Sequence, residues 1–126
     1  MNTTDIGMHG ESVAAKFLKK HGFRILEKNL HVSHNELDII AKNKEYIIFV
    51  EVKTRSSDQT LNTGFGSPAS AVDKSKQSRT VTAARGYLKN SKYTNLQPRF
   101  DVIEVYLDKN TQKVLKINHI INAFGA

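Results

Sequence analysis

The chain of 126 residues contains no cysteine, no tryptophan and only two prolines. Without cysteine it can form neither disulfides nor thiolate metal sites, so the composition does not indicate an oxidising compartment. Aromatic side chains are also few, with four tyrosines and six phenylalanines, and they form no run on which successive bases could stack. A dedicated single-strand-binding protein is therefore not indicated.

Long hydrophobic runs are missing as well, since the longest, Tyr46 to Val50, is far too short to span a bilayer. The first residues, MNTTDIGMHGES, have neither the basic flank nor the apolar run of a signal peptide. No internal repeat or long linker divides the chain, whose length fits one domain over residues 1–126. We therefore expect a single-domain cytoplasmic protein with no membrane partner.

Acidic residues are outnumbered by basic ones. Nineteen Lys and Arg against twelve Asp and Glu leave a net charge of +7 and a pI near 9.7. Such an excess favours a polyanionic partner, because neutralising a phosphate backbone releases its counterions. A basic surface that only keeps the protein soluble explains the charge equally well. Charge alone leaves both interpretations open.

Hydrophobic periodicity and turn residues predict the order helix, three strands, helix, two strands. The first helix begins at the N-cap candidates of residues 3–5 and ends before Gly22, and the second extends from Ala69 to about Asn90 with Ser70 as its cap. Residues 56–67 are polar and predict a mobile loop. Strands are predicted over residues 23–30, 36–41, 46–53, 99–107 and 113–117, with a last turn at 120–124. This αβββαββ order predicts an α/β fold with a mixed β-sheet flanked by helices.

Acidic side chains gather on the central pair of predicted strands. Because side chains alternate along a strand, Glu51 shares a face with Lys53, and Glu36 shares a face with Asp38. The turn between the strands decides whether these two sets meet. A one-residue slip would send the carboxylates to opposite faces of the sheet.

A hairpin closed over Asn43-Lys44 keeps the acidic side chains together. Counting back from that turn places Asp38 opposite Phe49 and Glu36 opposite Glu51, so that Asp38 is diagonal to Glu51 and within reach of a shared ion. The register therefore predicts one acidic patch formed by two neighbouring strands.

Several carboxylates on one patch repel each other, and a hard divalent cation relieves that repulsion. We predict a Mg²⁺ or Mn²⁺ site with Asp38, Glu51 and the backbone carbonyl of Val52 as ligands. Lys53 would orient a water, help to deprotonate it or stabilise the pentacovalent phosphate. The alternative is a solvated strand face on which Glu51 and Lys53 merely form an ion pair.

Asp38 followed by Glu51-Val52-Lys53 resembles the active residues of the PD-(D/E)XK nuclease superfamily. More narrowly, the chain resembles the YraN family of predicted endonucleases, which are related to archaeal Holliday-junction resolvases. The matching segments follow one another over nearly the whole chain: Gly7-x-x-Gly10-Glu11-x-x-Ala14, Asn35-Glu36-Leu37-Asp38-Ile39-Ile40-Ala41, Phe49-Val50-Glu51-Val52-Lys53-Thr54-Arg55, Phe65-Gly66-x-Pro68, Lys76-Gln77, Arg99-Phe100-Asp101-Val102 and Asn122-Ala123-Phe124.

This resemblance implies a restriction-endonuclease-like core. It also implies that Asp38, Glu51 and Lys53 are the active residues, and that Glu11 matches an additional carboxylate of resolvase-type relatives. A helix's first turn favours an acidic residue such as Glu11 in any case. Glu36 is either an outer ligand or a solvated acid beside the turn. The chain departs from the family at Asn35, where Gly usually stands, and Asn tolerates the left-handed backbone that Gly would supply.

Candidate nucleic-acid-binding residues surround these acids. Lys76, Gln77 and Arg79 on the second predicted helix, and Arg55 after the site strand, are placed to contact phosphates. Helices also carry such charges for solubility, Gln77 is as well explained as surface filler, and Arg55 as a partner in an exposed ion pair. His31 and His34 suggest zinc, but no ligand set with suitable spacing accompanies them.

The leading hypothesis is a Mg²⁺- or Mn²⁺-dependent endonuclease that hydrolyses phosphodiester bonds in DNA, with branched DNA as one candidate substrate. Its candidate catalytic residues are Asp38, Glu51, Lys53, Glu36 and Glu11. Two alternatives are a nuclease fold that binds nucleic acid without cleaving it, and an adaptor that retains the acids as a vestige. The resemblance adds a homodimer as an alternative assembly, although no apolar stripe in the sequence indicates an interface.

Overall fold

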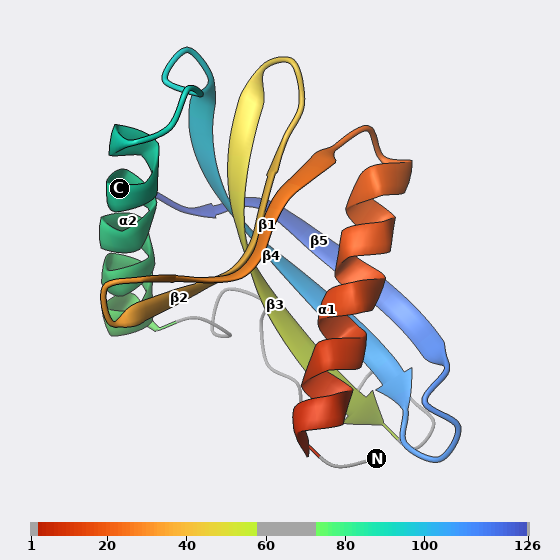
Figure 1. The fold of residues 1–126 in the computed structure, drawn as a ribbon. Coiled ribbons are helices and arrows are strands. Elements are labelled where there is room, and N and C mark those ends of the chain that lie inside the picture. The colour runs from red at the N-terminus through yellow and green to blue at the C-terminus, as the bar shows by residue number, and fades with distance from the viewer. Residues whose placement is uncertain (1–2, 58–72, 126) are drawn as a thin grey trace.

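The computed structural model describes residues 3–57 and 73–125. These residues form two helices and five strands, shown in Figure 1: α1 (Thr3–Lys20), β1 (Arg24–Val32), β2 (Asn35–Lys42), β3 (Tyr46–Ser57), α2 (Lys74–Lys89), β4 (Gln97–Asp108) and β5 (Val114–Phe124). The predicted α/β class and the αβββαββ order are confirmed. No helix in these two ranges is long and apolar enough to cross a bilayer.

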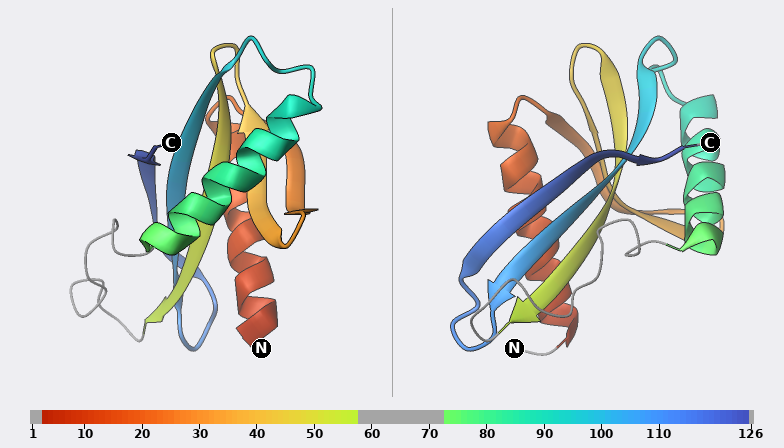
Figure 2. Two further views of the ribbon diagram at one scale, coloured as in Figure 1. Left: turned by 90° about the vertical axis from the view of Figure 1, so that its left-hand side faces the viewer. Right: turned by 180° about the vertical axis from the view of Figure 1, so that it is seen from behind.

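The strands form one mixed sheet in the order β1-β2-β3-β4-β5. Strands β3 and β4 are parallel, and the other neighbouring pairs are antiparallel. A parallel pair needs a crossover connection, and α2 belongs to it. The two turned views of Figure 2 show α1 and α2 on opposite faces of the sheet. The sheet is therefore the middle of three layers.

Each face of the sheet has its own hydrophobic cluster. On β3, Ile48 and Val50 pack in the cluster beneath α1, whereas Ile47 and Phe49 pack in the cluster beneath α2. This alternation continues to the end of the apolar run. Glu51 and Lys53 consequently lie on the α2 side of the sheet.

The turn between β2 and β3 is centred on Lys44-Glu45, and the prediction that it closes over Asn43-Lys44 was wrong. The Asn43 side-chain oxygen accepts hydrogen bonds from the backbone N–H groups of Glu45 (2.9 Å) and Tyr46 (2.8 Å), which moves the turn by one residue. Ile40 therefore pairs with Phe49, where the sequence placed Asp38. The shift amounts to two residues, so the β3 side chains keep their predicted faces. On β2, Leu37 packs beneath α2 and Ile39 beneath α1, although strand alternation predicts one face for both.

Two predicted boundaries also change. The last strand does not stop near residue 117 and turn at 120–124, because β5 continues to Phe124, which pairs with Phe100 across an irregularity in the β4–β5 ladder. Helix α2 begins at Lys74 with Asp73 as its N-cap, whose carboxylate accepts the Lys76 N–H at 2.7 Å. The predicted cap Ser70 and most of the predicted mobile loop, residues 58–67, lie outside the described residues.

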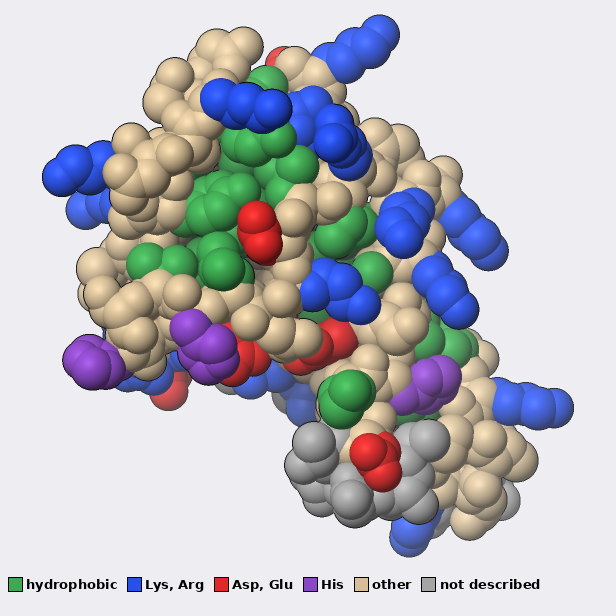
Figure 3. Space-filling view, viewed as in Figure 1, with side chains coloured by type: hydrophobic (Ala, Val, Ile, Leu, Met, Phe, Trp, Pro, Cys, Tyr) green, Lys and Arg blue, Asp and Glu red, His purple; other side chains and the backbone are tan. Residues whose placement is uncertain are grey.

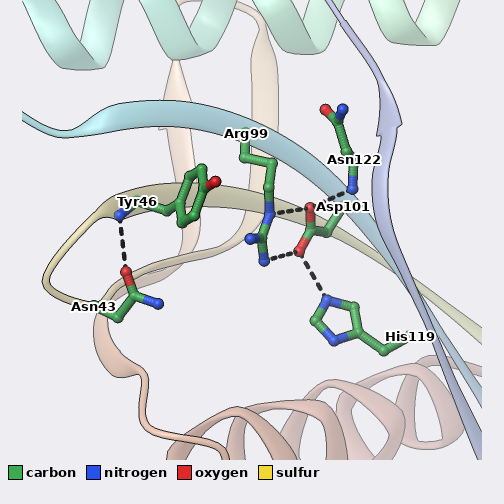
Figure 4. A network of polar contacts seen from close by, with 6 residues as sticks. All are labelled: Asn43, Tyr46, Arg99, Asp101, His119 and Asn122. Atoms are coloured by element: carbon green, nitrogen blue, oxygen red, sulfur yellow. Dashed lines mark hydrogen bonds and ion pairs between the residues drawn. The ribbon is translucent and has the colours of Figure 1, made fainter.

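A buried carboxylate fixes β5 against β4 (Figure 4). Asp101 is 0% exposed and accepts two hydrogen bonds from Arg99 (2.9 and 2.8 Å), one from His119 (2.7 Å) and one from the N–H of Asn122 (2.9 Å). Burial raises the pKa of this carboxyl, but the hydrogen bonds from His119, Arg99 and Asn122 outweigh it and hold the pKa below its usual range. Asp101 thus has a structural role.

Helix α1 approaches β3 closely at one glycine. A Cβ atom added at Gly10 would overlap the side chain of Thr54, whereas one added at Gly7 would meet nothing within 4 Å. The absence of a side chain at Gly10 therefore allows the helix to pack directly on the strand. The next residue of the helix is Glu11, which this contact brings to the sheet.

Candidate metal centre

Strands β2 and β3 separate at the candidate site. Their ladder ends at the pair Ile39–Val50, and Asp38 and Glu51 are the next residues on either strand. The register therefore places these two acids directly opposite each other, where the sequence predicted a diagonal arrangement. In Figure 1 the β1–β2 hairpin turns toward α2 beyond this point, while β3 continues in another direction. We call this place the fork.

The Asp38 side chain ties the two strands together at the fork. Its Oδ2 accepts a hydrogen bond from the backbone N–H of Val52 at 3.0 Å. In a strand the N–H and C=O groups of one residue point to the same side, as the paired exchange in antiparallel ladders requires. The carbonyl of Val52, a predicted metal ligand, consequently points toward Asp38 as well.

Glu51 lies on the α2 side of the sheet. Its exposed fraction is 7%, so the alternative of a solvated strand face does not describe it. Its Oε1 lies 3.7 Å from Nζ of Lys53 and 3.6 Å from Nζ of Lys76 on α2. The predicted catalytic lysine and a predicted nucleic-acid-binding lysine thus meet at one carboxylate. Their two positive charges partly balance the acids of the fork.

The pKa of Asp38 is raised to about 7, first by burial and then by the charge of Glu51 and a side-chain hydrogen bond with Glu51. The N–H of Val52 and the charge of Lys76 act in the opposite direction. A carboxyl held this far from its usual pKa marks a place where negative charge is crowded. Such crowding is typical of functional sites.

Two further acids complete the cluster. Carboxylate oxygens of Glu11, Glu36 and Asp38 lie within 4.8 Å of one another. The pKa of Glu11 is raised by burial first and then by the charges of Asp38 and Glu36, while a hydrogen bond with Asn29 and the charge of Lys28 lower it. The structure therefore brings together the predicted acids from α1 and β2, whereas Glu51 of β3 interacts with Asp38 but does not belong to this group of three.

The surface around the fork is basic. Figure 3 shows acidic side chains close together near the middle of this face, with Lys and Arg side chains spread around them. Glu11, Glu36 and Asp38 thus concentrate negative charge on a molecule whose net charge is +7. Acidic residues surrounded by basic ones can bind a cation while the basic residues attract a polyanion to it.

Comparison with known proteins identifies the family. Residues 10–105 match the model of the uncharacterised protein family UPF0102. The chain belongs to family UPF0102. It is 46% identical over 124 residues to a UPF0102 protein of Caldanaerobacter subterraneus subsp. tengcongensis, covering 98% of each chain. It is also 46% identical over 119 residues to a UPF0102 protein of Clostridium perfringens, covering 94% of this chain and 93% of the other.

The YraN resemblance predicted from the sequence is thereby confirmed, and the UPF0102 match includes every acid of the cluster. Among solved structures, an XisH family protein from Nostoc punctiforme aligns over 86% of this chain and 97% of its own, with 17% identity and a TM-score of 0.40. A likeness of this size establishes neither a shared fold nor a shared activity.

The residues predicted to contact phosphates on this UPF0102 chain do not form one surface. Arg79 is exposed, and its guanidinium donates to Ser75 on the same helix. Arg55 Nε lies 3.1 Å from Oε2 of Glu104, which is 1% exposed, so a phosphate at Arg55 would compete with a buried partner. Between α2 and the tip of the β1–β2 hairpin lies a hollow of about 230 Å³ lined by His34, Asn35, Glu36, Lys76, Arg79 and Thr80. Gln77 borders a different hollow with Lys74, Ser78, Val81, Thr82, Arg85 and Gly125.

The donor set fits a hard divalent cation. Carboxylate oxygens and a backbone carbonyl are the ligands that Mg²⁺ and Mn²⁺ prefer, and the chain offers no thiolate ligand because it lacks cysteine. The pKa of Asp38 is raised to about 7 by burial first and by the charge of Glu51 second, so a cation beside this carboxyl would favour its ionised form. The roles of Asp38, Glu51 and Val52 as ligands stay a prediction.

Asn29 is the site residue that the sequence analysis missed. It lies within β1, has a positive φ of 52°, and its side chain hydrogen-bonds Glu11. An Asn in a strand of alternating character gives no sequence signal of a left-handed backbone. Asn35, where such a backbone was considered, is the first residue of β2, and the positive φ of that hairpin belongs to Ser33 (57°).

Proposed function

We propose that the protein is a Mg²⁺- or Mn²⁺-dependent endonuclease that hydrolyses phosphodiester bonds in DNA, with branched DNA as a candidate substrate. The observation that carries this proposal is the meeting of Asp38 and Glu51 at the fork, with Lys53 beside them. It unites two acids on neighbouring strands with a lysine on the same face. This is the arrangement that metal-assisted phosphodiester hydrolysis requires.

In this proposal Asp38, Glu51 and the carbonyl of Val52 hold the ion, with Glu11 and Glu36 beside it. A bound divalent ion supplies a water of lowered pKa and polarises a phosphate oxygen. Glu11 and Glu36 add negative charge within 4.8 Å of Asp38 and so strengthen cation binding. Side chains of the protein would position the phosphate and the water and stabilise the developing charge.

Lys53 is the proposed catalytic cation. Its Nζ lies 3.7 Å from Glu51 Oε1, close enough to orient a water held at that carboxylate and to stabilise the charge of a pentacovalent phosphate. Lys76 approaches Glu51 from α2 at 3.6 Å and would hold a neighbouring phosphate. The two ammonium groups thus reach the same acid from different elements.

Arg79, Gln77 and Arg55 complete the proposed phosphate contacts. Such contacts fix the register of a backbone without reading its sequence. Arg79 shares a hollow with Lys76, which makes it the best placed of the three. The position of Arg55 against Glu104 favours an indirect role, in which it stiffens β3 behind Lys53.

The test is cleavage of labelled linear and four-way-junction DNA with Mg²⁺ or Mn²⁺. Wild type should cut, Asp38→Asn and Glu51→Gln should lose at least 100-fold in rate, and Lys53→Ala should lose a similar factor while it still binds the ion. Glu45→Gln, at the exposed turn of the same hairpin, is the matched control and should cut like wild type.

Two outcomes would contradict the proposal. Equal rates in wild type and Glu51→Gln would mean that the activity comes from another site or another protein. Tight, salt-sensitive DNA binding with no cleavage, unaffected by Glu51→Gln, would support the alternative of a binding protein that does not cut.

A further inference from the structure

An unusual backbone conformation occurs in β1 directly across from Asp38. Lys28 pairs with Ile39 and Leu30 pairs with Leu37, so Asn29 occupies the position opposite Asp38. Its φ is 52°, whereas a strand residue ordinarily has a strongly negative φ. Left-handed conformations disfavour most side chains, and Asn is among the few residues that adopt them readily. The ladder of an edge strand is thus distorted beside the acid cluster.

The Asn29 side chain lies close enough to the Glu11 carboxylate on α1 to lower its pKa by hydrogen bonding. A carboxylate has only acceptor oxygens, so the amide NH₂ of Asn29 is the donor. Carboxylate oxygens of Glu11 lie within 4.8 Å of those of Asp38 and Glu36. Asn29 therefore links the edge strand of the sheet to the helix that brings the third acid.

The other left-handed residues have different surroundings. Within the described ranges, the remaining non-glycine residues with positive φ are Ser33, Gln112 and Asn122. Ser33 lies in the β1–β2 turn and Gln112 in the turn before β5. Asn122 lies at an irregularity of the β4–β5 ladder, and its N–H donates to Asp101. Asn29 differs because its side chain holds an acid of the candidate metal centre.

We propose that Asn29 is a positioning residue of the metal centre: its left-handed backbone turns the amide toward α1, where it holds the Glu11 carboxylate facing the ion that Asp38 binds. This inference rests on the proposed function. Hydrogen bonds to a ligand set its orientation, and losing such a partner typically weakens metal binding by 10- to 100-fold. Asn29 acts through Glu11 and has no contact of its own with the substrate.

The test is titration of the metal-free protein with Mn²⁺, followed by the paramagnetic resonance signal of the free ion. Asn29→Gly and Asn29→Ala should both bind Mn²⁺ at least tenfold more weakly than wild type. Thermal unfolding without metal distinguishes the loss of the side chain from strain in the backbone, because Gly adopts a positive φ without strain and Ala does not. Asn29→Gly should therefore unfold at or above the wild-type temperature, and Asn29→Ala below it.

Asn122→Gly is the matched control, since it changes a left-handed Asn far from the cluster and should leave Mn²⁺ binding unchanged. A double-mutant cycle then tests the link to Glu11. In the Glu11→Ala background, which removes the acceptor, Asn29→Gly should cause no further loss of affinity.

Wild-type affinity in Asn29→Gly would overturn the inference while leaving the proposed function intact. An undiminished loss in the Glu11→Ala background would also overturn it, because Asn29 would then act by another route. A wild-type protein that binds no Mn²⁺ would overturn the proposed function, and this inference with it.

Discussion

Asp38 combines a structural and an electrostatic role in one side chain. Its Oδ2 accepts the N–H of Val52 and so closes the sheet where the ladder has ended. The same carboxyl lies against Glu51, and burial together with that charge raises its pKa to about 7. The metal-free fold therefore contains an acid whose ionisation opposes its stability.

This conflict predicts the pH dependence of the metal-free protein. Because the pKa of Asp38 is raised from 3.8 to about 7, the folded state binds more protons than the unfolded state between these values. The stabilising contribution of Asp38 is complete below about pH 4 and is lost as the pH rises through about 7. Relative to Asp38→Asn, wild type should lose ~2 kcal/mol of unfolding free energy between pH 5 and pH 8. Urea unfolding in EDTA measures the difference.

The amide of Asp38→Asn keeps an oxygen that can accept the Val52 N–H, so the comparison isolates the charge. Asp73→Asn serves as control, because Asn also caps a helix and position 73 is exposed. A difference between wild type and Asp38→Asn that is the same at both pH values would contradict the raised pKa.

At the scale of elements, α1 is placed by a single close contact. Gly10 packs against Thr54, and the neighbouring Glu11 reaches the acid cluster as a result. Helix, strand and site are therefore coupled through one position that accepts no side chain.

Gly10→Ala should destabilise the protein by ~2 kcal/mol, because the added Cβ overlaps Thr54 and the helix must move away from β3. The same shift should weaken Mn²⁺ binding by withdrawing Glu11. Gly7→Ala on the same helix is the matched control and should stabilise by up to ~1 kcal/mol, since no atom lies within 4 Å of its Cβ. Chemical denaturation and Mn²⁺ titration of both variants measure these effects. Equal behaviour of the two would show that the Gly10 contact is unimportant.

Much of the arrangement of helices and strands was predictable from the sequence. Strand periodicity located β3 and placed Glu51 and Lys53 on one face, because alternation depends only on local backbone geometry. The turn position was missed because the Asn43 side chain replaces a backbone acceptor. The full length of β5 was missed because Asp101 and the ladder with β4 hold its last residues, and these are long-range contacts. Asn29 was missed for the same reason, since its partner lies on another element.

At the scale of the whole molecule, the net charge of +7 is the feature that bears on a polyanionic partner. Figure 3 shows Lys and Arg side chains spread over the face on which acidic side chains lie near the middle. An ion held among the acids would neutralise their charge and make this face more positive. DNA affinity and metal binding should therefore be coupled.

DNA affinity should fall steeply with salt, since each neutralised phosphate releases counterions. Arg79→Ala should weaken binding to all sequences alike and reduce the slope of log K against log salt by about 1. Lys19→Ala, in the last turn of α1, is the control and should leave the slope unchanged. Fluorescence anisotropy with labelled duplex over a range of NaCl concentrations measures both. An unchanged slope in Arg79→Ala would remove this residue from the proposed contact surface.

The two-residue shift in the β2–β3 register bears on how this hairpin tolerates insertions and deletions. Adding or removing two residues between Lys42 and Ile47 returns every later side chain of β3 to the face it had before, whereas a change of one residue would turn Glu51 toward α1 and away from Lys76. We therefore expect length variation at this turn to occur in even steps, both in natural homologues and in engineered loop grafts that preserve activity.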